Sequence, residues 1–232
     1  MMKRALVASV VCLPILAGAA HASPINLVAN GSFESGLSGW TVTGGGAFPV
    51  SAVTTNTACC FGEFVPNDNI VGGSPDAAGN QAVYFVDDFA HQTLTQSVAL
   101  TVGTYEVGFD AYSPRNGFDN PGDAAFHGTI AGVPLASFTV HGSTPAIWVH
   151  FSGLASILSD GTYNVAFDFQ PAATGASADV VIDRVYITAS DLGGGTPIGG
   201  GDQVPEPATL SLLGLGTAGL IAKRRKRAAE SR

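Results

Sequence analysis

The side chains best suited to holding a sugar ring lie at residues 112–120 and at Trp148. Tyr112 leads into the polar loop SPRNGFDN, which carries Arg115 and Asn116. An aromatic face stacks on the C–H face of a pyranose, and polar neighbours bind its hydroxyls. We therefore expect these four side chains to contact a ligand. The plainer alternative is that Trp148 packs at the end of a sheet and that the loop is ordinary surface.

Catalytic chemistry finds little support in the sequence. Neither the zinc-binding pattern H-E-x-x-H nor the nucleophile pattern G-x-S-x-G occurs. The adjacent carboxylates Asp87 and Asp88 are of the type that serves glycoside hydrolysis, but neighbouring residues in a strand or loop usually point apart. Four histidines are isolated and are predicted to be surface or packed side chains: His91, His127, His141 and His150.

The elements that must position these residues are β-strands. Residues 103–112 read GTYEVGFDAY, in which Tyr105, Val107 and Phe109 alternate with residues on the other face. This period of two is typical of a strand with one buried face. Residues 161–169, GTYNVAFDF, repeat the pattern 58 residues later, which is too short a spacing for a separate sandwich. We interpret the two segments as equivalent strands of one all-β domain.

Other strands are expected wherever short apolar runs lie between turn residues. Gly, Pro, Asn and Asp separate these runs at intervals suited to a sandwich, and no long stretch of the domain has helical period. We predict an antiparallel β-sandwich of the jelly-roll type. The additional strands are expected at residues 82–86, 93–100, 126–130, 134–140, 147–152 and 180–188.

The N-terminus has the three parts of a secretory signal peptide. Lys3 and Arg4 precede an apolar run at residues 5–17, and Ala20-His21-Ala22 forms an A-x-A cleavage site. We expect cleavage after Ala22 and export of the chain. An uncleaved anchor helix is the alternative.

The C-terminal tail combines a turn, an apolar run and a cluster of bases. Pro205 and Pro207 prevent helix upstream, so a helix is expected to begin near Ala208. At 1.5 Å per residue, residues 208–222 would reach about 22 Å, which is a marginal span for a bilayer core about 30 Å thick. The basic residues 223–227 would stay on the cytoplasmic side.

The residues between the two ends are strongly acidic. Residues 23–203 hold two bases, Arg115 and Arg184, against sixteen acids, which gives a formal charge of −14. Such a surface repels nucleic acid and favours divalent cations or neutral and cationic partners. The predicted organisation is a signal peptide at 1–22, one domain at 23–190, a Gly-rich linker at 191–203 and the tail at 204–232.

The mature chain keeps two adjacent cysteines, because Cys12 leaves with the signal peptide. In an oxidising envelope, Cys59 and Cys60 are expected to form a strained vicinal disulfide or to bond elsewhere. No metal-binding or catalytic partners lie near them in the sequence, so we favour a structural role.

The tail resembles the PEP-CTERM sorting signal. The resemblance rests on Pro205-Glu206-Pro207, the apolar run and the basic cluster, in that order at the end of the chain. It implies an exosortase-type enzyme as a partner, which would recognise the Pro-Glu-Pro segment. It also implies a Gram-negative bacterium with a polysaccharide-rich envelope or biofilm, and transient anchoring in the inner membrane.

The domain resembles the carbohydrate-binding modules of families 4 and 9, which are galactose-binding-like jelly rolls. The matching segments are NLVANGSFESGLSGW at 26–40, LTQSVAL at 94–100, GTYEVGF at 103–109 and IDRV at 182–185. Their order covers essentially the whole domain. Residues 47–79 match nothing in that pattern.

The same resemblance implies a structural calcium ion that joins the N-terminal segment to the last strand. Carried over to this sequence, Glu34 and Asp183 would give carboxylates and Asn30 a backbone carbonyl, which suits the oxygen preference of Ca²⁺. The alternative is that Glu34 hydrogen-bonds a turn and Asp183 caps an edge.

These observations together predict a non-enzymatic, exported protein that binds or organises extracellular polysaccharide at the cell envelope. Neutral glucans or xylans are the expected ligands, because the acidic domain would repel anionic glycans unless calcium bridges them. The rival interpretation is a calcium-stabilised structural or adhesive matrix protein without a sugar site. A hydrolase ranks below both.

Overall fold

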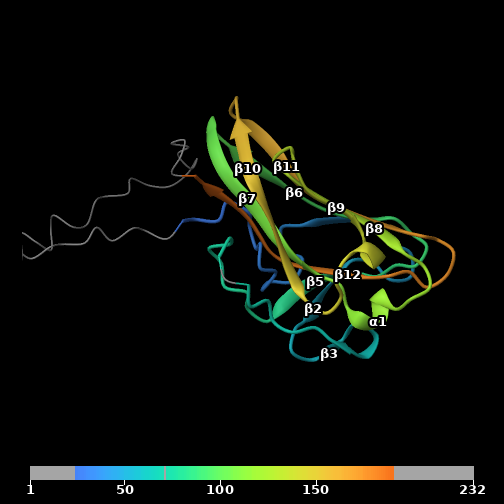
Figure 1. Ribbon diagram of the computed structural model, residues 1–232. Helices are drawn as coiled ribbons and strands as arrows, with labels where there is room; N and C mark the ends of the chain where they lie inside the picture. Colours follow the sequence, from blue (N-terminus) through green and yellow to red (C-terminus); the bar gives the residue numbers. More distant parts are fainter. Residues whose placement is uncertain (1–23, 71, 191–232) are drawn as a thin grey trace, which may run out of the picture. The chain divides into compact units, whose positions relative to one another are not determined.

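The computed structural model describes residues 24–70 and 72–190, all of which belong to one compact unit. Nearly all of the regular structure in these residues is β, in two five-stranded antiparallel sheets (Figure 1). The prediction of an all-β antiparallel sandwich is confirmed. Sheet A has the order β1 (Thr41–Gly44), β6 (Gln92–Leu100), β11 (Gly161–Pro171), β8 (Ala124–Ile130), β9 (Val133–Thr139). Sheet B has the order β10 (Trp148–Ile157), β7 (Gly103–Tyr112), β12 (Val180–Ala189), β5 (Gln81–Phe85), β2 (Ser51–Thr54).

The eight longer strands match the segments expected from sequence, although β10 runs to Ile157, five residues further than predicted. The short strands β1 and β2 were not predicted, because four residues carry too little periodicity to recognise. The remaining elements are the pair β3 (Ala58–Cys59) and β4 (Glu63–Phe64), the 3-10 turns η1 (Cys60–Gly62) and η2 (Val140–Gly142), and the single-turn α1 (Arg115–Phe118).

The core lies between the sheets and is rich in phenylalanine. The two similar segments form β7 and β11, one in each sheet, so that the alternating residues of each point at the other. Phe109 and Phe167 meet edge to face with ring centroids 4.9 Å apart, and both are fully buried, as is Phe126 beside them. Truncation of such a ring to alanine typically costs about 3–5 kcal/mol. The inward face of both strands is as predicted.

The N-terminal segment is tied to the last strand by backbone and side-chain bonds. The N–H of Leu27 donates to the carbonyl of Ile187 at 2.8 Å, and that of Val185 donates to Gly31 at 2.9 Å. A Cβ on Gly31 would lie 2.0 Å from the carbonyl oxygen of Val185, so only glycine allows this approach. The glycine of the NGSFE motif therefore serves packing.

The connection from β2 to β5 covers part of the outer face of sheet B. We call residues 65–76 (without 71) the strap. The strap is held by two side chains that rise from the sheet: the indole N–H of Trp148 donates to the carbonyl of Pro66 at 3.0 Å, and Arg184 donates to Ile70 at 2.5 Å and to Ser74 at 3.2 Å. The outer face of sheet B is therefore partly buried.

No helix in the two described ranges is long and apolar enough to cross a membrane. The predicted signal peptide with Ala20 and Ala22, the linker at 191–203, and the tail with Pro205, Glu206, Pro207 and the helix at 208–222 lie outside the described residues. The domain boundaries stay predictions.

Candidate ligand-binding site

Two of the four predicted contact residues, Tyr112 and Trp148, lie on the outer face of sheet B, next to the strap. They face each other across β7 and β10 with ring centroids 5.3 Å apart. Tyr112 is only 4% exposed. The prediction for Tyr112 is corrected: a buried ring offers no face to a sugar, and neighbouring chain covers a position that strand alternation alone leaves open. Trp148 is partly exposed, and its contact with a ligand stays a prediction.

The other two residues, Arg115 and Asn116, lie in α1 at one end of the sandwich. Figure 1 shows α1 and β3 at this same end. Arg115 is exposed, and Asn116 is half-buried with its Nδ2 atom 3.5 Å from the carbonyl oxygen of Phe61. Phe61 belongs to residues 47–79, which match no segment of the carbohydrate-binding-module pattern. This part of the chain therefore lies next to the loop that was predicted to contact a ligand.

Asn116 lines a pocket of about 230 Å³, which we call the loop-end pocket. Its size is below the range of about 300–1,000 Å³ typical of sites that enclose a drug-sized ligand, so it suits one ring of a longer chain. Four separate segments of the chain form its walls. The lining residues are Phe61, Val86, Asp88, Asn116, Gly117, Asn120, Ala176 and Asp179.

Exposed aromatic rings border the loop-end pocket. Phe61 is 68% exposed and meets the 45% exposed Phe48 edge to face, with ring centroids 5.6 Å apart. Phe89, beside Asp88 in the chain, is also 68% exposed. Exposed aromatic groups of this kind commonly mark binding surfaces. These rings belong to no periodic pattern in the sequence, so they could not be identified from it.

The polar groups of the loop-end pocket are fixed by neighbours. The hydroxyl of Tyr84 donates to Asp179 at 2.5 Å. Asn120 donates through Nδ2 to the carbonyl of Ser177 at 2.7 Å, and Asp88 accepts the N–H of Ser177 at 2.7 Å. Side chains held in this way keep a defined position, which orients a ligand more precisely than a mobile loop does.

Asp87 joins the two loops that carry Phe48 and Phe89. Burial alone would raise its pKa, but N–H groups of Phe89, Ala90, Gly46 and Phe48 donate to the carboxylate and hold the pKa below its ordinary value. Asp87 and Asp88 thus have separate partners and separate tasks, as expected for adjacent residues. Asp87 and Asp88 therefore do not face a common site, whereas Asp88 and Asp179 both line the loop-end pocket.

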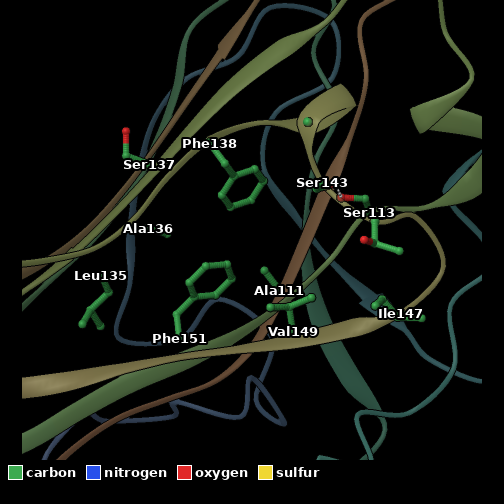
Figure 2. Close-up of a pocket in the computed structure, with 12 residues that line it drawn as sticks. Ala111, Ser113, Leu135, Ala136, Ser137, Phe138, Ser143, Ile147, Val149 and Phe151 are labelled. Atoms are coloured by element: carbon green, nitrogen blue, oxygen red, sulfur yellow. Dashed lines mark hydrogen bonds between the residues drawn. The ribbon is translucent and has the colours of Figure 1, made fainter.

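A larger cleft lies between the edges of the two sheets (Figure 2). It has a volume of about 410 Å³ between β9 and β10. Phe138 and Phe151 lie almost parallel there, with centroids 5.7 Å apart, and the hydroxyls of Ser113 and Ser143 bond to each other at 2.9 Å. No acid, base or amide lines the cleft. It is less suited to sugar hydroxyls than the loop-end pocket, where amides and carboxylates converge.

A buried polar cluster lies between sheet B and the strap. Asp110 on β7 is opposite Asp183 on β12, and Asp68 comes from the strap. The Nη1 atom of Arg184 is 3.7 Å from Asp68 Oδ2 and 3.7 Å from Asp110 Oδ2, and His150 Nδ1 is 2.6 Å from Asp110 Oδ1. Sequence analysis missed this cluster, because His150 has no acidic or basic neighbour in the sequence.

The environment of the cluster favours neutral side chains. Burial raises the pKa of Asp110 to about 9, Asp68 adds to this effect, and the Arg184 guanidinium opposes it. Burial also raises the pKa of Asp183 to about 9. Burial and the nearby Arg184 lower the pKa of His150. Burial therefore disfavours the charged forms of both partners in the short contact between His150 and Asp110.

Arg184 occupies a strained position in this cluster. Its φ is 52°, and the pairing of β12 with β7 shifts register between Asp183 and Tyr186. A bulge re-aims a side chain, and here it turns the guanidinium toward the strap. The conformation costs about 1–3 kcal/mol, which the bonds to the strap must offset.

The three residues predicted to bind calcium have separate partners. Glu34 accepts the N–H groups of Asn80 at 2.8 Å and Gln81 at 2.7 Å, as the plainer alternative supposed. The carbonyl of Asn30 accepts the indole N–H of Trp40 at 3.2 Å, whereas Asp183 belongs to the buried cluster. Among the described residues, no group of three or more His, Cys, Asp or Glu side chains is arranged to hold a metal. The calcium ion stays a prediction.

The backbone at Cys59 and Cys60 passes from β3 into η1. Their side chains lie outside the described part of the structure, so the disulfide also stays a prediction.

Residues 203–226 match a family model described as the PEP-CTERM protein-sorting motif. The tail carries a sorting signal. The match implies that the chain is exported and sorted to the surface of a Gram-negative cell. It says nothing about the chemistry of residues 24–190. No curated protein matches the chain.

Several solved structures are similar to the domain at low identity. A family 61 carbohydrate-binding module in complex with β-1,4-galactotriose has 22% identity and a TM-score of 0.49, covering 72% of this chain and 99% of that one. A family 16 module has 18% identity and a TM-score of 0.40, covering 70% and 99%. The CBM22-1 xylan-binding domain of Xyn10C from Paenibacillus barcinonensis has 16% identity and a TM-score of 0.41, covering 73% and 97%. The fold assignment itself rests on the two sheets described above.

Proposed function

We propose that this chain is a non-enzymatic, exported polysaccharide-binding protein, and that it holds its ligand at the loop-end pocket. The observation that carries the proposal is the exposed ring of Phe61 beside the amide of Asn116 and the carboxylate of Asp88 in one pocket. An aromatic face and fixed oxygen and nitrogen groups are what a pyranose needs for stacking and for hydroxyl bonds.

The charge of the pocket indicates which glycans it accepts. Two carboxylates and no lysine or arginine line it, and residues 23–203 carry a formal charge of −14. Neutral glycans avoid the resulting repulsion, and amino-sugar glycans gain attraction from it. Uronic-acid polymers are disfavoured. Arg115, which is exposed beside Asn116, is the nearby base that would contact an acidic substituent.

The sorting motif in the tail supports a location of this binding activity at the cell envelope. An exosortase-type enzyme would recognise Pro205-Glu206-Pro207 while the apolar residues 208–222 hold the chain transiently in the inner membrane. The glycine-rich residues 191–203 would act as a flexible linker between domain and membrane. The exopolysaccharide of a biofilm is the ligand that this location makes available.

Affinity electrophoresis in gels containing neutral, amino-sugar or uronic polysaccharides tests the proposal. We expect retardation in neutral or amino-sugar gels, and about tenfold weaker binding for Phe61→Ala and for Asn116→Ala, since tenfold corresponds to about 1.4 kcal/mol. Phe64→Ala is the matched control: Phe64 is 54% exposed in the adjacent β4 but does not line the pocket. Its binding should equal that of the unaltered chain.

Three results would count against the proposal. Absence of retardation in every gel would favour the rival interpretation of a structural or adhesive matrix protein. Release of reducing sugar during incubation with the retained polysaccharide would show hydrolysis. Retardation that Phe64→Ala weakens as much as Phe61→Ala would place the binding surface outside the pocket.

A further inference from the structure

The four edges of the two sheets differ in how well they are protected. An edge strand presents unpaired N–H and C=O groups, and proteins usually blunt it with short length, proline, a bulge or charge. The edges β1 and β2 are each four residues long. The edge β9 contains Pro134, and its pairing with β8 is interrupted by a register shift. Three of the four edges are therefore blunted.

The fourth edge, β10, has none of these features. It is ten residues long, contains no proline, and pairs with β7 without a register shift from Trp148 to Ile157. No backbone hydrogen bond from its other side is recorded within residues 24–70 and 72–190. Within the part of the chain that the structure describes, the backbone donors and acceptors on this side of β10 are therefore open.

The strand β10 and the chain on either side of it in sequence are uncharged and partly apolar, although the exposed Glu106 of β7 lies opposite Leu154. Residues 124–159 contain no Asp, Glu, Lys or Arg, although residues 23–203 contain sixteen acids. On and beside the strand, Val149 is 37% exposed, Leu154 55% and Leu158 88%. Figure 2 shows Ile147 and Val149 on the β10 side of the cleft, where they are open to solvent. Lysine or glutamate would be expected here if this edge strand had to be kept from pairing with another chain.

We propose that two copies of this chain associate through β10, with the two strands antiparallel about a twofold axis. A strand laid antiparallel beside itself is self-complementary, which is the requirement of a twofold interface. A second copy is the occupant that the charge distribution selects. Two domains of the same strong negative charge repel each other over most orientations, and the uncharged stretch around β10 is where they can approach.

The pairing would give the polar backbone groups of this edge hydrogen-bond partners and would bury its apolar side chains. Sheet B of one copy continues into sheet B of the other, so the open N–H and C=O groups of both strands form ladder bonds. The exposed aliphatic side chains at 149 and 154 pack against the partner strand. Each dimer presents two ligand sites, so binding to a repetitive polymer gains from multivalency if both engage.

Sedimentation velocity of the full-length chain, over about a hundredfold range of concentration, tests the association by mass action. We expect a monomer–dimer equilibrium whose dissociation constant rises at least about tenfold in Leu154→Glu, because the pairing would bury a carboxylate against an apolar seam with no base to pair with it. Ile25→Glu is the matched control: Ile25 and Leu154 are both 55% exposed aliphatic residues, and Ile25 lies in the N-terminal segment. Circular dichroism verifies that each variant is folded.

Hydrogen exchange provides a second, independent measurement. Amides on the open side of β10 should exchange more slowly at high protein concentration than at low concentration, while those of the β2 edge should not change. A chain that stays monomeric throughout the concentration range overturns the proposal. A dimer whose β10 amides are not protected, or which Leu154→Glu leaves intact, overturns it as well, because the copies then meet elsewhere.

Discussion

The strap should come away from sheet B when Arg184 loses its guanidinium. In Arg184→Gln, the bonds to the carbonyls of Ile70 and Ser74, at 2.5 and 3.2 Å, are lost, and so is the charge 3.7 Å from Asp68 and Asp110. Hydrogen bonds to a charged group contribute about 1.5–3 kcal/mol each, and removal of one member of a buried ion pair costs about 3–5 kcal/mol.

These two contributions overlap, because the same guanidinium holds the strap and pairs with Asp68. We therefore expect Arg184→Gln to lower the free energy of unfolding by about 3–5 kcal/mol, a large part of the about 5–15 kcal/mol that a domain possesses. The substitution keeps a side chain at the same positive φ, so the backbone strain at 184 is similar in both proteins. The loss of stability therefore measures the contribution of the guanidinium group.

Urea unfolding followed by circular dichroism measures this loss, and brief thermolysin digestion under native conditions reports on the strap at Ile70. Arg115→Gln is the control, because Arg115 is the other arginine of residues 23–203 and is exposed. Its variant should unfold within about 0.5 kcal/mol of the unaltered chain. If Arg184→Gln lowers the free energy of unfolding as little as Arg115→Gln and the strap remains resistant to cleavage, then the bonds from Arg184 do not hold the strap.

Two further outcomes follow from the buried carboxylates and from Glu34. Asp183 has a folded-state pKa of about 9 against an ordinary value of 3.8, so its contribution to stability is complete below about pH 4 and is lost as the pH rises toward 9. Asp183→Asn should therefore show a smaller fall in melting temperature between pH 5 and pH 8 than the unaltered chain, and parallel curves would contradict this. Glu34→Gln should lower the melting temperature, because a neutral amide accepts the N–H groups of Asn80 and Gln81 less strongly. If calcium is bound there, EDTA should lower the melting temperature of the unaltered chain and have less effect on the variant; no effect of EDTA on either would count against the ion.

The sequence was sufficient to predict those parts of the fold that repeat with a period of two. The inward residues of GTYEVGFDAY and GTYNVAFDF are buried as their alternation indicates, except that Tyr163 is half-buried. The outward residues are where prediction failed: Asp110 and Tyr112 are buried because chain far away in sequence lies over them. The sequence of the strap has no periodic pattern, so its position over the outer face of sheet B could not be predicted from local sequence.

The candidate site was only partly predictable for the same reason. The polar composition of residues 113–120 identified Asn116, because a loop rich in hydrogen-bonding groups is visible in sequence. Phe61 and Asp179 join it from segments 55 and 63 residues away along the chain. Their convergence depends on the packing of loops at one end of the sandwich, which only the three-dimensional structure supplies.

The place of β12 in sheet B governs when this domain can fold during export. It is the last strand of the domain in sequence, yet it lies in the middle of the sheet between β7 and β5, and the N-terminal segment bonds to it at Ile187 and Val185. A domain emerging from a translocation channel with its N-terminus first can therefore close neither sheet B nor its own N-terminal end until residue 189 has crossed. Sheet A does not wait for β12, because its last strand in sequence, β11, ends at Pro171; the two sheets can therefore pack together fully only after the last strand has crossed.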